Sequence, residues 1–219
     1  MAFGAFILIV LAAILAVLGL YVAGAVSLLR KLRAGWGNWH WPARIAHLTM
    51  ALALIATPYF AYKAYDHSVI FGFVPAPLVA KVIEHRTERL LGVGPGGNET
   101  GFIVYRLTAR SAAWATDQGS RLTGFLPGGP EQWRTTPVLV EGDKAGRWQR
   151  GDVMRSDTKV PDIENYLNQY GAGFRVERPY AEALNRAMNR PGSFYSYGAG
   201  GRFTLVDPMG GKVYVAYAG

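Results

Sequence analysis

Four histidines, His40, His47, His67 and His85, are the side chains of this sequence best suited to bind a metal ion or haem, because imidazole is a common ligand of both. Their positions do not match the ligand spacing of a metal site. His40 and His47 lie seven residues apart, which is about 10 Å along a helix and too far for two ligands of one metal ion. The chain has no cysteine, so thiolate ligands, disulfides and cysteine nucleophiles are excluded. We predict no metal site.

One stretch around His47 has a specific resemblance. Residues 43–57, ARIAHLTMALALIAT, combine a basic residue and a histidine with a run of small and apolar residues. This stretch is similar to the haem-ligating helices of cytochrome b561-type membrane proteins. The resemblance implies a redox subunit that holds haem through His47. Haem ligation in that family requires histidines on several packed helices, whereas the other long apolar segment, residues 3–29, contains none. We therefore predict no cofactor, with haem binding through His47 as the alternative.

Motifs of common hydrolases and nucleotide-binding enzymes are missing from the sequence. It contains no H-E-x-x-H, G-x-S-x-G, P-loop or paired-carboxylate pattern. Gly92, Gly94 and Gly97 match the dinucleotide-binding spacing G-x-G-x-x-G, which requires a strand before it and a helix after it. Here a charged segment with helical spacing precedes the glycines, and Pro95 removes one backbone donor. The stretch is therefore interpreted as a linker, and the chain is predicted not to be an enzyme.

Two long apolar segments predict a membrane anchor. Residues 3–29 contain no charged side chain, and residues 45–62 form a second such run. About 20 apolar residues span the hydrocarbon core of a bilayer. The first run is too long for the core of a cleaved signal peptide, and no basic residue precedes it. The sequence therefore predicts a membrane α-helical hairpin, with two transmembrane helices within residues 1–63.

The short segment between these runs, residues 30–44, predicts their orientation. Its basic residues are Arg30, Lys31, Arg33 and Arg44, and it has no acidic residue. Short loops rich in lysine and arginine remain on the cytoplasmic side of a membrane. The loop is therefore predicted to be cytoplasmic, and both termini to lie on the other side. This places the C-terminal domain in the periplasm of a bacterial inner membrane.

Three tryptophans, Trp36, Trp39 and Trp41, lie in or next to this basic loop. Tryptophan prefers the headgroup level of a bilayer, where its ring is buried and its N–H remains hydrated. We predict a membrane-interface anchor made of these tryptophans together with the four basic residues of the loop. The positive net charge of +8 is concentrated in this part of the chain, so it does not predict nucleic-acid binding.

Small residues form a stripe on the first apolar segment. They are Ala12, Ala16, Gly19, Ala23 and Ser27. Their spacing places them on one face of a helix, where small side chains allow another membrane helix to approach closely. The stripe is predicted to be a helix-packing interface. Its partner is either the second helix of the same chain or a different subunit.

The remainder of the chain is predicted to contain a surface segment and a soluble domain. Residues 64–97 are expected to form an apolar collar at the membrane surface, an amphipathic helix over 77–91 and a glycine-rich linker. Residues 98–219 are expected to form a small α+β domain with a short antiparallel sheet. Its predicted helices lie within 101–122, 162–170 and 179–190, and its predicted strands are 137–141, 193–197, 202–206 and 212–217, the last two as a hairpin.

Together these patterns predict a non-catalytic accessory or scaffolding subunit of a larger inner-membrane complex. Its partners are expected to be other membrane-protein subunits and the lipid bilayer. Tyrosine and other aromatic residues are enriched at protein interfaces, and the predicted protein contacts are Phe71, Phe73, Tyr195 and Tyr197. Two alternatives remain open: the haem-binding redox subunit, and an envelope-biogenesis factor whose outer domain binds a peptide or glycan.

Overall fold

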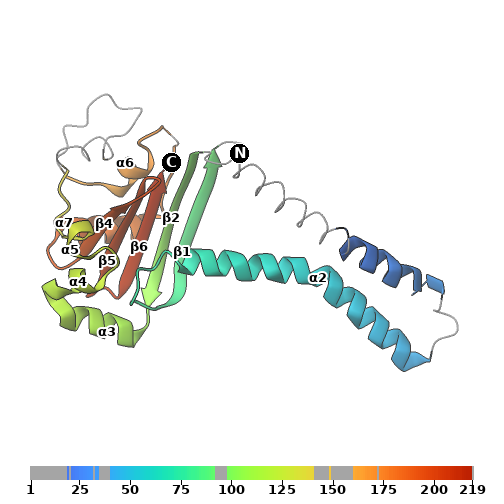
Figure 1. The fold of residues 1–219 in the computed structure, drawn as a ribbon. Coiled ribbons are helices and arrows are strands. Elements are labelled where there is room, and N and C mark those ends of the chain that lie inside the picture. The colour runs from blue at the N-terminus through green and yellow to red at the C-terminus, as the bar shows by residue number, and fades with distance from the viewer. Residues whose placement is uncertain are drawn as a thin grey trace, which may run out of the picture. The chain divides into compact units, whose positions relative to one another are not determined.

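The computed structural model describes residues 19, 21–31, 33–34, 40–91, 98–140, 148, 160–171 and 173–218. Contacts divide the chain into two compact units, Met1–Val69 and Ile70–Gly219. The first unit contains most of one long helix, and the second contains a β-sheet covered by helices (Figure 1).

The long helix α2 (Trp41–Phe71) has 31 residues and contains Pro58 in its interior. Pro42 lies in its first turn, where a missing N–H needs no partner. The sequence predicted a shorter helix over residues 45–62, followed by a separate apolar collar. Instead the helix continues through the first part of that collar, because no glycine or proline interrupts the chain between Pro58 and Gly72.

Apolar side chains of α2 remain largely exposed. Leu52, Ile55 and Phe60 are 68%, 64% and 65% exposed. Within the described residues, α2 is the one helix that is long and apolar enough to cross a membrane. The second predicted span, residues 3–29, lies mostly outside the described residues, although residues 21–31 are helical.

The second unit is built on a six-stranded antiparallel sheet with the strand order β1-β2-β6-β5-β4-β3. The hairpin that the sequence predicted is confirmed, and its strands pair from Arg202 opposite Tyr217 to Asp207 opposite Lys212. Through β6 the hairpin joins the longest strand pair of the sheet. The strands are β1 (Ala80–Leu91), β2 (Asn98–Leu107), β3 (Arg134–Thr135), β4 (Phe194–Gly198), β5 (Arg202–Asp207) and β6 (Lys212–Ala218).

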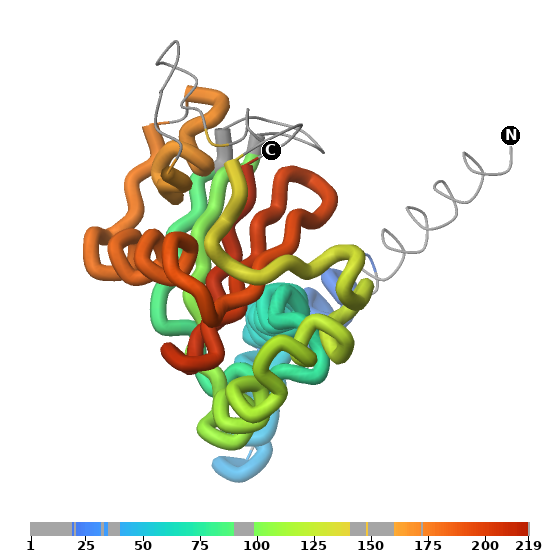
Figure 2. Tube along the Cα trace, turned by 90° about the vertical axis from the view of Figure 1, so that its left-hand side faces the viewer, coloured from blue at the N-terminus to red at the C-terminus, as the bar shows by residue number. Residues whose placement is uncertain are grey.

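Helices cover both faces of this sheet, as Figure 2 shows from the side. The helices predicted at 162–170 and 179–190 are confirmed as α6 (Ile163–Leu167) and α7 (Arg178–Asn189), which lie on one face. Asp162 starts α6 by accepting hydrogen bonds from two backbone N–H groups, as N-cap residues do. The other face carries α3 (Ala109–Gln118), η1 (Gly119–Arg121), α4 (Leu122–Phe125) and α5 (Gly129–Gln132).

Alternate residues of the central strands form two hydrophobic clusters. In β6, Tyr214 and Ala216 pack in the cluster that includes α6 and α7. Val213 and Val215 pack in the cluster that includes residues of α3 and α4. Successive side chains of a strand point to opposite faces, so both faces of this sheet are apolar and both require a helical layer.

The predicted amphipathic helix at 77–91 is wrong, because most of this segment forms β1. The strand pairs with β2, but its register shifts between Ala80 and Val82 and again between Ile83 and His85. Each β-bulge inserts an extra residue and interrupts the alternation of side chains. The apolar residues therefore lost the two-residue period that would have indicated a strand.

Two further segments differ from the predictions. The helix expected within 101–122 begins only at Ala109, because residues 98–107 form β2 between β1 and β6. Residues 137–140 of the expected strand at 137–141 have no strand structure. The linker at 92–97 lies outside the described residues, but the strands on either side of it pair with each other. The second unit therefore starts at Ile70, rather than at residue 98.

Gly200 and Gly201, in the turn between β4 and β5, both have φ of +64°. A residue with a Cβ in the left-handed region costs about 1–2 kcal/mol. Gly200→Ala should lower the free energy of unfolding by that amount and no more, because its Cβ would meet no atom within 4 Å. Gly201→Ala should cost about 1–3 kcal/mol more, because its Cβ would lie 2.1 Å from the carbonyl oxygen of Ala218. Denaturant unfolding of both variants measures this, and equal losses would contradict the close contact between the turn and β6.

Candidate functional site

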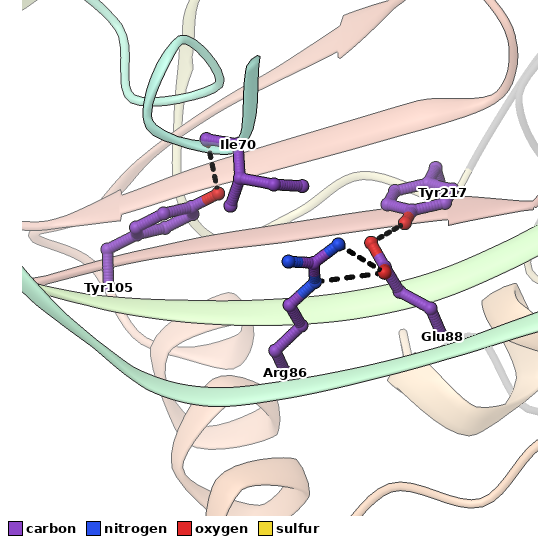
Figure 3. Close-up of polar contacts among 5 residues, drawn as sticks. All are labelled: Ile70, Arg86, Glu88, Tyr105 and Tyr217. Atoms are coloured by element: carbon purple, nitrogen blue, oxygen red, sulfur yellow. Dashed lines mark hydrogen bonds and ion pairs between the residues drawn. The ribbon is translucent and has the colours of Figure 1, made fainter. Parts of the chain in front are cut away.

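Aromatic and charged side chains gather on the sheet near the end of α2. We call Phe73, Arg86, Glu88, Arg202 and Tyr217 the aromatic–arginine patch. Arg86 Nε donates a hydrogen bond to Glu88 Oε2 at 2.9 Å, and the Tyr217 hydroxyl donates to Glu88 Oε1 (Figure 3). The Arg202 guanidinium lies 5.6 Å from the centre of the Phe73 ring, and the rings of Phe73 and Tyr217 are 6.3 Å apart. The patch therefore connects three strands with the segment after α2.

A glycine at position 101 makes this arrangement possible. Gly101 lies on β2, opposite Glu88 of β1 and opposite Tyr217 of β6. A Cβ at Gly101 would lie only 2.2 Å from Cζ of Tyr217. The tyrosine ring therefore fills the space that a side chain on β2 would need, and its hydroxyl reaches across β2 to Glu88. This contact joins two strands that are not neighbours in the sheet.

The patch combines partial exposure with fixed side-chain positions. Arg86 and Glu88 are 32% and 30% exposed, and the other three residues are half-buried. Burial raises the pKa of Tyr217, and its hydrogen bond to Glu88 raises this pKa further. The hydroxyl therefore stays protonated at neutral pH. Arginine and tyrosine side chains in such positions are typical of the residues that dominate binding energy at protein interfaces.

Tyr105 holds the start of the second unit against the sheet. Its hydroxyl donates a hydrogen bond of 2.6 Å to the carbonyl oxygen of Ile70 (Figure 3), and its ring packs edge-on against Phe71 at 5.9 Å. Tyr105 is fully buried, and burial raises its pKa. Because Ile70 and Phe71 are held in this way, Phe73 is positioned two residues later at the patch.

A second polar cluster lies around Glu84, on the α7 side of the sheet. The Glu84 side chain is 8% exposed and accepts hydrogen bonds from Arg106 and, at 2.8 Å, from Lys212. Burial alone would raise the pKa of Glu84, but the hydrogen bonds from Lys212 and Arg106 outweigh it and hold the pKa below its ordinary value. The neighbouring His85 stacks on Tyr180 with ring centres 4.5 Å apart. This cluster joins β1, β2 and β6 beneath α7.

The predicted protein contacts fall into two groups. Phe73 belongs to the patch and packs beside Tyr217, and Phe71 packs beside Tyr105. Tyr195 is only 1% exposed, which places it in the core rather than on a contact surface. The prediction failed there because strand alternation turns Tyr195 toward α6 and α7. Tyr197 is half-buried in the same cluster, and its hydroxyl accepts a hydrogen bond from Trp148.

The other predicted site residues lie in the first unit. His47 lies within α2, and its Nδ1 contacts the Ala43 carbonyl oxygen at 2.8 Å. Within the described residues, no three histidine, aspartate or glutamate side chains gather to hold a metal ion. Of the predicted interface anchor, Trp41, Arg30, Lys31 and Arg33 are exposed and Arg44 is half-buried, while Trp36 and Trp39 lie outside the described residues.

The predicted small-residue stripe is described over its C-terminal half. Ala23 and Ser27 are exposed, and a Cβ at Gly19 would meet no atom within 4 Å. Ala12 and Ala16 lie outside the described residues. The packing partner of the stripe therefore remains a prediction.

Most of the patch was not predicted from the sequence. Arg86 and Glu88 share one face of a strand because they are two residues apart, but the segment was interpreted as a helix. Arg202 and Tyr217 lie on strands that were predicted, yet only the pairing of β6 with β2 brings Tyr217 next to Gly101. The available signal was an isolated glycine in a run of β-forming residues, as in TGFIVY. Such a glycine often marks a site where another group approaches the strand backbone closely.

Comparison of this chain with known protein families, with characterised proteins and with solved structures finds no match.

Gly101→Ala should push the Tyr217 ring out of its position and lower the free energy of unfolding by about 1–3 kcal/mol. In a chain that also carries Tyr217→Ala, the same substitution should cost much less, because the obstructing ring is gone. Urea unfolding of the two single variants and the double variant measures this coupling. Gly124→Ala is the control, because its Cβ would meet no atom within 4 Å. Losses that simply add would contradict the packing of Tyr217 over Gly101.

Proposed function

We propose that this chain is a non-catalytic accessory or scaffolding subunit of a larger bacterial inner-membrane complex. In this proposal two helices anchor it in the membrane, and the Ile70–Gly219 unit is a periplasmic interaction domain. The observation that carries the proposal is the exposure of apolar side chains along α2. Leu52, Ile55 and Phe60 are each more than 60% exposed, and shielding one such side chain from water is worth about 1.5–3 kcal/mol. A lipid bilayer provides that shielding, and a helix satisfies its own backbone hydrogen bonds there.

The positions of aromatic residues on α2 support a membrane-spanning role. Trp41 and Tyr62 are 71% and 65% exposed, and aromatic side chains favour the two interfaces of a bilayer. They are 21 residues apart, which is about 32 Å along a helix and close to the roughly 30 Å of the hydrocarbon core. Between them in the sequence, Arg44 in the first turn is the one charged side chain.

Charge distribution supports the proposed orientation. Arg30, Lys31 and Arg33 are exposed and belong to a short basic segment of the kind that stays in the cytoplasm. With that segment inside, α2 runs outward and the sheet unit lies in the periplasm. The helical residues 21–31 support a second span within residues 3–29, which would return the N-terminus to the periplasmic side. This makes the chain a multi-pass protein of the inner membrane.

The aromatic–arginine patch is the proposed contact with another subunit. Its arginines and aromatic rings are preorganised by contacts within the sheet, so little side-chain freedom is lost on binding. Its location a few residues after α2 suits a partner that is itself in the membrane. The other proposed partner is the bilayer, and nucleic acid is not a proposed partner.

Affinity purification of the full chain in a mild detergent tests the proposal. Partner subunits should be recovered in a fixed ratio. Arg202→Ala should reduce their recovery about tenfold or more, because truncating a dominant interface arginine costs about 2 kcal/mol or more. Arg178→Ala is the matched control, since its side chain is 90% exposed on α7, and it should recover partners as the unchanged chain does.

Two results would contradict this proposal. Recovery of a monomer that turns over a substrate would show an enzyme acting alone. A haem absorption band in the purified chain would instead favour the redox subunit with His47 as a ligand. If the Arg202→Ala and Arg178→Ala variants lost partners equally, the chain would still belong to a complex, but the patch would not be its contact.

A further inference from the structure

A cleft lies between the C-terminal half of α7 and the turn of the β5–β6 hairpin. Its volume is about 450 Å³, within the range of small-molecule binding sites. Three cationic side chains, Arg186, Arg190 and Lys212, line the cleft, together with one carboxylate, Asp207. The described lining therefore has a net positive charge.

Two of these cations are poorly neutralised by the protein. Arg190 is exposed and has no ion pair or hydrogen bond within the described residues. Arg186 lies 3.9 Å from Glu182, at the outer limit of an ion pair. Lys212, in contrast, is held by Glu84 at 2.8 Å. Arg186 lies in the last turn of α7 and Arg190 directly follows the helix. Both line the same cleft, where like charges repel each other. An anion between them would relieve that repulsion.

A buried tyrosine points to a ligand independently of the charges. Tyr214 lines the cleft and is 2% exposed. Within the described residues its hydroxyl has no hydrogen-bond partner, whereas the hydroxyl of buried Tyr105 on the other face of the sheet is bonded to Ile70. Burial of the residue fixes the Tyr214 ring, so its hydroxyl is held in place at the cleft. A ligand oxygen in the cleft would complete the bonding of Tyr214.

We propose that this cleft binds a small molecule that carries a phosphate monoester. Arg186 and Arg190 bind phosphate oxygens, and Tyr214 donates a hydrogen bond to another. Donors from three side chains suit the several oxygens of a phosphate better than the two of a carboxylate, which one arginine can saturate. Ala187 and Met209 also line the cleft, and they suit a small apolar body on the ligand. This site does not depend on the proposed membrane-complex function.

Calorimetric titration of the full chain with phenyl phosphate, in a nonionic detergent, tests this site. Phenyl phosphate should bind in a one-to-one ratio and more tightly than benzoate. Arg190→Gln and Tyr214→Phe should each weaken its affinity about tenfold or more, as expected for one hydrogen bond to a charged group. Tyr214→Phe should leave the thermal unfolding temperature nearly unchanged, because its hydroxyl bonds to none of the residues that the structure describes.

Arg175→Gln is the matched control, because it removes the same charge from an exposed position before the opposite end of α7. It should bind phenyl phosphate as the unchanged chain does. Absence of binding would overturn the proposal, and so would benzoate binding as tightly as phenyl phosphate. Unchanged affinity in the Tyr214→Phe and Arg190→Gln variants would place any binding elsewhere and would also overturn it.

A phosphate monoester can come from a soluble molecule or from the headgroup of phosphatidic acid. The same titration in bilayer discs separates these sources. Equal affinity for phenyl phosphate in discs of phosphatidylcholine, with and without phosphatidic acid, would identify a soluble ligand. If the unchanged chain bound phenyl phosphate more weakly in discs that contain phosphatidic acid, the lipid headgroup would be identified as a competitor for the cleft. In that case the affinity of the Arg190→Gln variant should not differ between the two kinds of disc.

Discussion

The removal of apolar side chains from water is complete in the second unit and not in α2, and the rest of the structure depends on that division. In the second unit the sheet is apolar on both faces, so it is covered by α6 and α7 on one side and by α3 to α5 on the other. In α2 the apolar side chains stay exposed over most of the helix. The sheet unit supplies its own cover, whereas α2 is long and apolar enough to cross a membrane and is left uncovered by the described residues.

The two proposed binding regions lie on opposite faces of one sheet, and both depend on β6. Tyr217 points to the face of the aromatic–arginine patch, and Tyr214 points to the face of α7 and the cationic cleft. They are three positions apart along the strand, so strand alternation directs them to opposite faces. Each tyrosine is buried or half-buried by its own layer of the fold. A subunit contact and a ligand site can therefore be occupied at the same time.

Regular periodicity made part of this fold predictable from the sequence. The apolar spacing of α6 and α7 and the turn residues between β5 and β6 indicated these elements correctly. β1 was missed because two bulges disrupt its alternation. The start of the second unit was missed because a glycine-rich stretch between two paired strands looks the same in sequence as a linker between domains. The patch could not be predicted, since Glu88, Gly101 and Tyr217 come together only through strand pairing over more than 100 residues.

Site-specific labelling tests most directly the central claim that α2 spans the membrane with the sheet unit outside. The chain has no cysteine, so single variants can be labelled with a membrane-impermeant maleimide without background. In intact spheroplasts Ser120→Cys should react, and Ala34→Cys should react only after the inner membrane is broken. Ile55→Cys, at an exposed apolar position of α2, should react only after detergent is added. Labelling of Ile55→Cys as fast as Ser120→Cys without detergent would show that α2 lies in water and would contradict the account.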